Sequence, residues 1–500
     1  MRYILNDNIR LYSYADHPYS VYDKERGFFY DVPKKTFTRL VACDGKTDAE
    51  DADAYEELLQ KNLIRPAREG EKLSPDRHWQ VYGHDRILFM NLEITERCNY
   101  NCRHCFNAEG FRVPRSELSL PEIRHILDEA YEYGIFNVVL TGGEPMIHPD
   151  FMEIVRYISK KGMNLSEINT NGSRITKEML EEFAELGMQP MMKISFDGTG
   201  FHNWMRGMDA SSSARSIEEE TVEAIRLCTA YGFRVFVQMN LNALNKDCIP
   251  ASLELLDSLG VYRTRIIRTS ESPRWLESIS ADGIGIMSWK EYFDECLKIA
   301  EFYLKREHSM SLIMWQFAFL HSRKKLFFAY KIAEDGVRED TPLCSERLDI
   351  CANGELYPCL QMSGYFKAHG FRLGSIRESS LKELISDSPY QTLVGCTRGD
   401  KKRSCKSCGE CPFFSCCANS CPALSLLSHG AYLGRDDSAC IFFRDGYYQK
   451  LKALLPPDFK DMRPLSSCPD PAYLMQLETE KLWTRPYNST DYRELLSPTE

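Results

Sequence analysis

From residue 87 onward, the sequence repeats one pattern six times: a short run of strand-forming residues, then an amphipathic helical segment. The expected strands are Ile87–Thr95, Phe136–Thr141, Leu165–Thr170, Met192–Phe196, Arg234–Asn240 and Arg263–Arg268. Strands that alternate with helices favour a parallel sheet, and a sheet of this length is expected to curl into a full or partial barrel. We therefore predict an α/β fold with a partial (β/α)6 TIM-like barrel over residues 87–285, whose active face lies at the loops after the strands.

Composition and charge exclude several classes of protein. The chain has 500 residues, 43% of them hydrophobic and 27% charged, which is typical of a globular protein with more than one core. A net charge of −10 argues against a nucleic-acid partner. No signal peptide is evident, and the strongest apolar window, Ser311–Leu320, is too short to span a membrane. We expect a cytoplasmic protein without a membrane partner, whose 19 cysteines are mainly metal ligands rather than disulfides.

Three thiols stand in the loop that follows the first expected strand. Cys98, Cys102 and Cys105 form a C-x3-C-x2-C run. Three thiolates this close in sequence can hold one iron-sulfur cube and leave its fourth iron without a protein ligand. The alternatives are a structural zinc site, which His104 could complete, or three reduced core thiols. The spacing favours the cluster.

A second motif follows the second expected strand, where Thr141 precedes Gly142, Gly143, Glu144 and Pro145. The two glycines allow the backbone to approach a ligand closely, and a carboxylate at this place can bind an ammonium group. A Gly-Gly turn before a helix is common, so the motif is weak evidence when taken alone.

Together, the cysteine loop and the Gly-Gly-Glu-Pro run resemble the radical S-adenosylmethionine (SAM) superfamily, over about residues 87–270. The resemblance implies that Cys98, Cys102 and Cys105 are the catalytic residues. They would hold a 4Fe-4S cluster whose free iron chelates the amino and carboxylate groups of SAM. Glu144 would then contact the SAM ammonium.

The same resemblance implies further contacts to SAM. His104, where the family usually has an aromatic residue, would lie near the adenine. Asn171 and Ser195 would lie near the ribose, and Arg206 near the carboxylate. Asn171-Gly172 and Asp197-Gly198 can equally be simple strand-to-helix turns. The full set implied to bind the cofactor is His104, Gly142, Gly143, Glu144, Pro145, Asn171, Ser195 and Arg206.

Seven further cysteines stand later in the chain: Cys344, Cys359, Cys408, Cys411, Cys417, Cys421 and Cys440. Their spacing resembles the pattern of the SPASM domain, which we expect over residues 341–445. The resemblance implies two auxiliary 4Fe-4S clusters, and so three clusters in the whole protein. Family precedent gives Cys344, Cys359 and Cys421 to an inner cluster and the other four cysteines to an outer one. A zinc ribbon is the alternative for Cys408 and Cys411.

This assignment leaves the inner cluster one thiolate short. We predict Cys351 as the fourth ligand, because it is the nearest cysteine in sequence, beside an expected hairpin turn over residues 352–355. Cys405 and Cys396 are rivals. If Cys351 instead faces solvent and no rival binds, an iron stays open and could take a substrate thiolate.

Residues 1–78 are expected to form a separate unit, with strands Ile9–Tyr14, Tyr19–Tyr22 and Phe28–Asp31 and helices Lys34–Cys43 and Asp48–Asn62. This order resembles the RiPP recognition element, a small winged-helix domain that captures a leader peptide by adding it as a strand to its own sheet. An ordinary cap on the barrel is the alternative. A polar linker follows over Glu71–Asp85. Residues 286–340 are expected to form a helical bridge, and residues 446–500 a C-terminal extension of unassigned role.

These resemblances imply a radical SAM enzyme that matures a ribosomally made precursor peptide. The expected product is a thioether link from a cysteine sulfur to a carbon, of the sactipeptide or ranthipeptide type, with carbon-carbon crosslinking next. The expected partners are the precursor peptide and a low-potential electron donor, a flavodoxin or ferredoxin. The alternatives are an anaerobic sulfatase-maturating enzyme that forms formylglycine, and a non-catalytic iron-sulfur sensor. The sequence singles out no general base.

Overall fold

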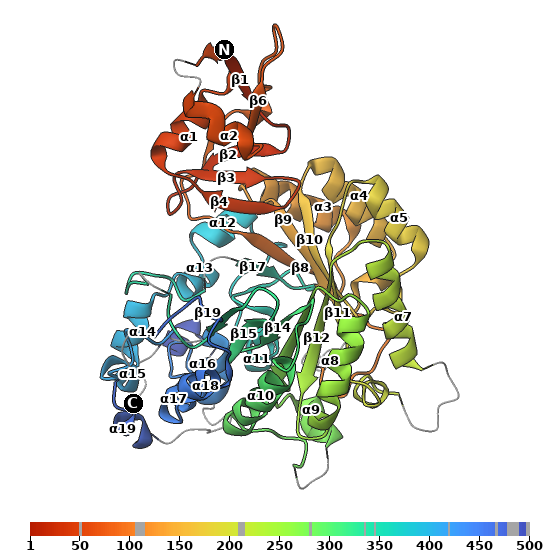
Figure 1. Ribbon diagram of the computed structural model, residues 1–500, viewed down its shortest axis with the longest axis vertical. Coiled ribbons are helices and arrows are strands. Elements are labelled where there is room, and N and C mark those ends of the chain that lie inside the picture. Colours follow the sequence, from red (N-terminus) through yellow and green to blue (C-terminus); the bar gives the residue numbers. More distant parts are fainter. Residues whose placement is uncertain are drawn as a thin grey trace.

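The chain folds into an N-terminal domain, a central barrel and a cysteine-rich C-terminal region (Figure 1). The structure is a computed structural model. It describes residues 1–49, 53–105, 116–208, 216–279, 283–334, 337–344, 347–418, 421–465, 469–477 and 490–496.

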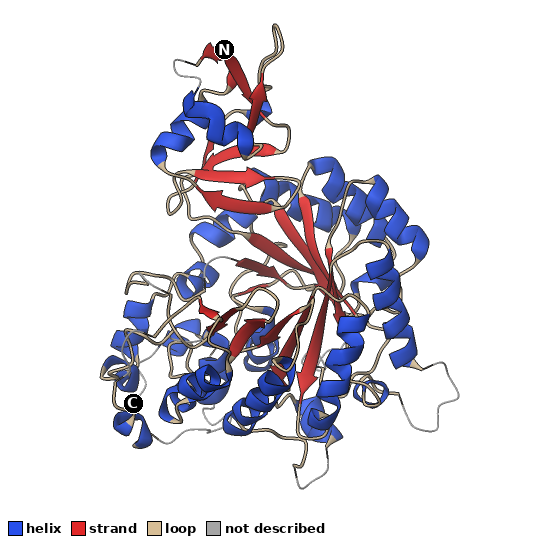
Figure 2. Cartoon of the chain, in the orientation of Figure 1, coloured by secondary structure: helices blue, strands red, loops and turns tan. Residues whose placement is uncertain are grey.

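The barrel is built on neighbouring parallel strands that follow one another in chain order, with helices on the outside of the sheet (Figure 2). The strands are β8 (Phe89–Thr95), β9 (Asn137–Gly142), β10 (Asn164–Thr170), β11 (Met191–Ser195), β12 (Val235–Leu241), β13 (Arg263–Arg268) and β14 (Ser311–Met314). The helices between them are α3 (Leu120–Glu132), α4 (Phe151–Lys161), α5 (Lys177–Glu185), α6 (His202–Met205), α7 (Ile217–Ala230), α8 (Ile249–Ser258), α9 (Pro273–Ser278) and α10 (Trp289–Tyr303). The predicted α/β fold with a partial TIM-like barrel is confirmed.

Local sequence explains why these elements form. Helix α3 begins with a reciprocal capping box between Ser119 and Glu122, and it turns the apolar face of Ile123 and Leu127 into the core. In α7, the Ser216 side chain accepts a hydrogen bond from the Glu219 backbone N–H, which satisfies an otherwise orphaned donor.

The predicted helical bridge over residues 286–340 is wrong beyond its first helix. After α10, the chain forms β14 and then two antiparallel strands, β15 (Ala318–His321) and β16 (Leu326–Ala329), which extend the barrel sheet. Apolar runs of four residues, separated by turns at Gln316 (φ 67°) and Lys325 (φ 53°), are too short for buried helices. Hydrophobicity alone does not distinguish such runs from helical segments.

The cysteine-rich region joins the other edge of the barrel sheet. Strand β17 (Arg347–Ile350) pairs in parallel with β8, and β18 (Leu356–Tyr357) returns antiparallel to β17, so the expected hairpin is present. The following helices are α11 (Ser363–His369), α12 (Leu381–Ser386), α13 (Pro389–Val394), α14 (Arg398–Ser404), α15 (Lys406–Gly409), α16 (Pro422–His429) and α17 (Asp437–Arg444). The C-terminal extension adds α18 (Tyr447–Leu454), β19 (Lys460–Asp461), α19 (Ala472–Met475) and a 3-10 turn, η7 (Tyr492–Leu496).

The N-terminal domain contains two small sheets. One has the strand order β4-β3-β2-β7, and the other has the order β5-β1-β6. The strands are β1 (Arg2–Leu5), β2 (Ile9–Ser13), β3 (Ser20–Asp23), β4 (Phe28–Asp31), β5 (Asp44–Asp48), β6 (Ile64–Pro66) and β7 (Gln80–Val81). The helices are α1 (Lys34–Val41) and α2 (Glu56–Gln60). The predicted strands β2, β3 and β4 are present, but the sheet around β1 was not expected, and Asp48 ends a strand instead of starting a helix.

The N-terminal domain packs against the barrel at the amino ends of its strands. Aromatic rings of β2, β3 and β4 surround Phe136, which directly precedes β9. The Tyr22 hydroxyl donates to Asn137 Oδ1 at 3.0 Å, and the Tyr14 hydroxyl donates to the Gly134 carbonyl at 2.8 Å. The carboxyl ends of the strands therefore point away from this domain. In the described residues, no helix is long and apolar enough to cross a membrane.

Candidate active site

The cysteine loop after β8 is packed against the Gly-Gly-Glu-Pro loop after β9. The backbone N–H groups of Gly143 and Glu144 donate to the carbonyls of Thr95 and Arg97, at 2.7 and 2.8 Å. A Cβ atom on Gly143 would lie 2.3 Å from the Arg97 oxygen, so a larger residue would force the two loops apart. The glycines are needed for this close approach between the two loops, whereas the sequence predicted an approach to a ligand.

Glu144 is a fully buried carboxylate held by three donors. Its Oε1 accepts from the Thr170 hydroxyl at 2.8 Å and from the Met146 N–H at 3.1 Å, and its Oε2 accepts from the Asn171 N–H at 2.7 Å. Burial raises the pKa of Glu144 to about 7 although these hydrogen bonds act to lower it. An ammonium group that reached this carboxylate would relieve the cost of its burial, so the site fits an amino acid ligand.

Polar groups surround the thiols of the cysteine loop. Cys98 Sγ accepts from the Tyr100 N–H at 3.4 Å and from Asn171 Nδ2 at 3.9 Å, and Cys102 Sγ accepts from Arg206 Nη1 at 3.6 Å. Burial raises the pKa of the Cys98 thiol to about 11. Thiolates at this place therefore need a strong positive charge beside them, and a bound iron-sulfur cluster supplies one.

Helix α6 and the turn after it hold the other side of the cysteine loop. The Arg103 N–H donates to the Met205 carbonyl at 2.9 Å. Gly207 has a φ of +86°, and a Cβ there would lie 2.1 Å from the Asn101 oxygen. This contact places Arg206 next to Cys102. The sequence did not predict this contact.

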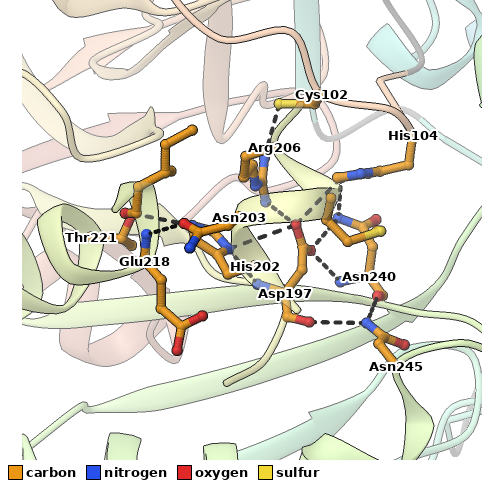
Figure 3. A network of polar contacts seen from close by, with 12 residues as sticks. Cys102, His104, Asp197, His202, Asn203, Arg206, Glu218, Thr221, Asn240 and Asn245 are labelled. Atoms are coloured by element: carbon orange, nitrogen blue, oxygen red, sulfur yellow. Dashed lines mark hydrogen bonds and ion pairs between the residues drawn. The ribbon is translucent and has the colours of Figure 1, made fainter. Parts of the chain in front are cut away.

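A buried network centred on Asp197 connects the cysteine loop to β12 (Figure 3). Asp197 Oδ2 lies 2.7 Å from Arg206 Nη2 and 3.7 Å from His104 Nε2, while Oδ1 accepts from the Asn240 N–H at 2.9 Å. Burial opposes ionisation of Asp197, but Arg206, His104 and His202 together lower its pKa to about 2. Asp197 therefore carries a negative charge that balances the Arg206 guanidinium beside Cys102.

His104 is neutral in this network, because burial lowers its pKa to about 4. Its Nε2 lies 3.0 Å from Asn240 Nδ2, whereas its buried Nδ1 has no hydrogen-bond partner among the described residues. A buried nitrogen without a partner is costly, which is consistent with a ligand that completes this part of the site.

The structure therefore gathers the predicted site residues at the carboxyl ends of β8 to β11. Ser195 ends β11 and is half-buried, and its hydroxyl has no hydrogen-bond partner among the described residues. Asp197, His202 and Asn240 belong to this buried network, but the sequence pattern assigns them no role. Their position at or after the ends of expected strands was the one sequence feature that could have indicated a role.

The later cysteines form two groups. Cys359 is half-buried close to Cys344 and Cys421, and desolvation raises the pKa of its thiol well above the usual value. Cys408, Cys411, Cys417 and Cys440 line one cavity with about 420 Å³ of space free of protein atoms, part of it open to solvent. We call the first set the inner cysteines and the second the outer cysteines. In the described part of the chain, no three His, Cys, Asp or Glu side chains are grouped tightly enough to hold a single metal ion.

The candidates for the fourth inner ligand differ in their surroundings. Cys405 forms a hydrogen bond with Cys408, so it lies with the outer cysteines. Cys396 Sγ donates to the Thr392 carbonyl at 3.3 Å. Cys351 is fully buried beside Glu93 and Lys367, so it does not face solvent.

The C-terminal extension covers the outer cysteines. Leu474 of α19 and Leu477 line their cavity, and the Tyr473 hydroxyl donates to the Ser407 carbonyl at 2.9 Å. This contact gives part of residues 446–500 a structural role that the sequence did not indicate.

Known proteins share both parts of this arrangement. The radical SAM superfamily matches residues 92–256, and SPASM, an iron-sulfur cluster-binding domain, matches residues 344–412. The AdoMet-dependent heme synthase of Methanosarcina barkeri is 27% identical over 361 residues, covering 70% of this chain and 95% of that protein. The subtilosin biosynthesis protein AlbA of Bacillus subtilis is 28% identical over 162 residues, covering 32% of this chain and 34% of AlbA.

A solved structure extends the likeness in fold. Streptococcus suis SuiB bound to precursor peptide SuiA matches with a TM-score of 0.59 and 13% identity, over 88% of this chain and 99% of SuiB. Three observations point to the same assignment. They are the sequence matches, the cysteine loop beside the buried Glu144, and the two later groups of cysteines. Residues 92–256 of the barrel are therefore similar to radical SAM domains, and residues 344–412 of the cysteine-rich region are similar to SPASM iron-sulfur cluster-binding domains.

Proposed function

We propose that this protein is a radical SAM enzyme that modifies a ribosomally made precursor peptide, most simply by forming thioether crosslinks. The observation that carries the proposal is the buried Glu144 carboxylate, which lies next to the three-cysteine loop at the carboxyl end of the barrel. A carboxylate with a pKa near 7 and a loop of three thiols suit the amino group of SAM and the cluster that chelates it.

The residues of the site have distinct roles in this proposal. Cys98, Cys102 and Cys105 hold the SAM-binding cluster, and Glu144 accepts hydrogen bonds from the SAM amino group. Arg206, held by Asp197, orients the Cys102 sulfur. Asn171, His104 and Ser195 line the space for the nucleoside, and Gly142, Gly143 and Pro145 shape the loop that carries Glu144. When bound, the cofactor supplies a 5′-deoxyadenosyl radical that abstracts a hydrogen atom from the substrate.

Support for a peptide substrate comes from the N-terminal domain and from the relatives. SuiB matches 88% of this chain, which is more than residues 87–500 alone could supply, so the likeness reaches into the N-terminal domain. SuiB binds a precursor peptide, and AlbA acts in the biosynthesis of a bacteriocin. Strand β4 is an edge of its sheet, where a leader peptide could add as a further strand.

Thioether formation removes two hydrogens from the peptide. One leaves as a hydrogen atom to the radical, the thiol proton passes to a base, and one electron must leave the substrate as the sulfur-carbon bond forms. We propose that Cys344, Cys359, Cys421 and Cys351 would hold one auxiliary 4Fe-4S cluster and the outer cysteines a second one, and that these clusters would supply an acceptor for this electron. A flavodoxin or ferredoxin is the proposed electron donor to the SAM-binding cluster.

The heme synthase match favours a second candidate, oxidation of a tetrapyrrole. That relative is matched over 95% of its own length. Two further alternatives to thioether formation would use the same radical chemistry. They are carbon-carbon crosslinking of a peptide and oxidation of a residue to formylglycine.

One experiment separates these candidates. The anaerobically reconstituted protein is incubated with SAM, a reductant and either Cys-containing precursor peptides encoded near its gene or iron coproporphyrin. We expect 5′-deoxyadenosine together with a peptide that has lost two hydrogens per link and whose linked cysteine resists alkylation. A modified porphyrin with unchanged peptides would support the second candidate instead. Absence of 5′-deoxyadenosine with every substrate would remove the enzyme proposal, and a Cys102→Ala variant controls for uncatalysed chemistry.

A further inference from the structure

Three cations surround one aromatic ring on the wall of the barrel. Lys193 Nζ lies 5.4 Å from the centre of the Phe236 ring, and the guanidinium carbons of Arg263 and Arg265 lie 5.8 and 5.6 Å from it. Contacts of this length are attractive, because the face of an aromatic ring carries negative charge density. The ring of Phe236 on β12 therefore gathers cations from β11 and β13 into one group. We call Lys193, Arg263 and Arg265 the lumen cations.

Alternation along β13 shows that its two arginines face the inside of the barrel. Successive side chains of a strand point to opposite faces of the sheet. Thr264 and Ile266 are fully buried, and Ile266 belongs to the core shared with the outer helices, whereas Arg263 and Arg265 are half-buried. The helices cover the outside of the sheet (Figure 2), so the arginines point inward. Their partial exposure shows that solvent reaches them there.

The strand register places Arg265 in one row with a residue of the proposed SAM site. Ser195 is paired with Gln238 across β11 and β12, and Gln238 is paired with Arg265 across β12 and β13. Neighbouring strands are about 4.8 Å apart, so Arg265 lies about 10 Å from Ser195 along the wall. Arg263 lies two residues nearer the amino end of β13. A substrate that enters the barrel to meet the radical would contact this wall.

The two arginines use little of their hydrogen-bonding capacity. Each guanidinium has five N–H donors. In the part of the chain that the structure describes, each guanidinium donates one hydrogen bond and neither forms an ion pair. Arg263 Nε donates to Ser311 Oγ at 3.0 Å, and Arg265 Nη2 donates to Gln238 Oε1. Arg265 Nε is buried and has no partner among the described residues, which is costly until a ligand accepts from it.

Burial also makes the charges of this wall costly. It lowers the pKa of Arg265 below its usual value, and it lowers the pKa of Lys193 to about 8. Lys193 has an anionic partner, since Glu167 Oε1 lies 3.0 Å from its Nζ. The arginines have the geometry for a further anion, because the planar fork of a guanidinium matches a carboxylate through two parallel hydrogen bonds.

We propose that Arg265, with Arg263 beside it, binds a carboxylate group of the substrate inside the barrel. This inference rests on the proposed function and narrows the substrate to one that carries a carboxylate near the modified carbon. Both candidate substrates can supply that group: a peptide through an acidic side chain or its C-terminus, and a tetrapyrrole through its propionates. The arginines fix the position of the substrate relative to the radical and take no part in the transfer of the hydrogen atom.

The first test measures the site without knowledge of the substrate. Radiolabelled glutarate, a small dicarboxylate, is bound to the anaerobically reconstituted full-length protein and measured by equilibrium dialysis. SAM is present and the reductant is omitted, so that the open iron of the cluster is not available to glutarate. We expect Arg265→Gln to weaken glutarate binding about 10-fold or more, because charge-assisted hydrogen bonds are lost. Unlabelled glutaramide, which has the same length and no charge, should not compete.

Arg234 provides a matched control. It is exposed directly before β12, and its guanidinium carbon lies 5.8 Å from the centre of the Tyr262 ring. Arg234→Gln therefore removes an equal charge from the surface and should leave glutarate binding unchanged. If Arg265→Gln lowers the iron content, Arg263→Gln tests the same wall. Glutarate that does not bind the wild type, or that binds the Arg265 and Arg263 variants as tightly as the wild type, overturns the inference.

The second test identifies the source of the carboxylate by turnover. The precursor peptide is prepared with each carboxylate in turn replaced by an amide, and iron coproporphyrin is prepared as its methyl ester. One of these changes should lower kcat/KM of the wild type about 10-fold or more and have a much smaller effect on Arg265→Gln, whose partner is already absent. A loss with an amide assigns the group to a peptide, and a loss with the ester assigns it to a tetrapyrrole. No loss with either overturns the inference. The two levels stay distinguishable, because absence of 5′-deoxyadenosine removes the enzyme proposal whatever the glutarate measurement shows.

Discussion

The buried carboxylate of Glu144 is expected to destabilise the folded protein until a cation reaches it. Burial raises the Glu144 pKa from its usual 4.5 to about 7. Since one pKa unit corresponds to about 1.4 kcal/mol, the ionised carboxylate costs the folded state roughly 3 kcal/mol. The perturbation that tests this is Glu144→Gln, which keeps the size of the side chain and removes its charge.

The pH dependence has a definite sign. Because the folded pKa is raised, the cost is absent below the unfolded pKa of 4.5 and is complete above the folded value near 7. The wild type should therefore lose stability relative to the glutamine variant as pH rises, and about 2 kcal/mol of this change should fall between about pH 5.5 and about pH 8. The glutamine amide cannot accept hydrogen bonds from all three donors. This lowers the free energy of unfolding of the variant by a constant amount but does not alter the dependence on pH.

The assay is urea unfolding of cluster-loaded protein without SAM at both pH values, for wild type and variant. Glu185→Gln, at an exposed position of α5, serves as the control and should give a difference that does not change with pH. The Glu144→Gln variant should also bind SAM about 10- to 100-fold more weakly, because a charge-assisted hydrogen bond is lost. A stability difference independent of pH, or an unchanged SAM affinity, would refute the reasoning.

Three further predictions follow from particular contacts. Asp197→Asn removes the charge that balances buried Arg206, so we expect about 3 kcal/mol of lost stability and an altered spectrum of the SAM-binding cluster; a spectrum like the wild type would contradict the role given to this pair. Cys351→Ala should perturb the inner cluster alone in iron counting and Mössbauer spectra, whereas an unchanged inner cluster would exclude Cys351 as its ligand. A leader held at the N-terminal domain must pass the length of β9, six residues or about 20 Å, so modification should cease once fewer than about six residues separate the leader from the modified residue. Mass spectrometry of shortened precursors measures this limit, and continued processing of shorter tethers would contradict it.

The sequence by itself determined the parts of this protein that depend on local pattern. Most barrel strands are short runs of strand-forming residues followed by an amphipathic helix, so β8 to β13 lie within a residue or two of their predicted bounds. The cysteine loop and the Gly-Gly-Glu-Pro run can be recognised from the sequence because their functional residues lie close together in the chain. The pattern was insufficient where apolar runs are short, and for that reason the strands β14 to β16 were expected to be helical.

Only the tertiary structure decided which distant residues meet. Asp197, His104 and Arg206 share one buried network because β11, the cysteine loop and α6 converge, and no local spacing encodes that meeting. The position of Cys405 beside Cys408 likewise depends on how helices pack. Residues far apart in sequence come together through burial of apolar surface across the whole chain, so their pairing and its electrostatics appear only in the folded protein.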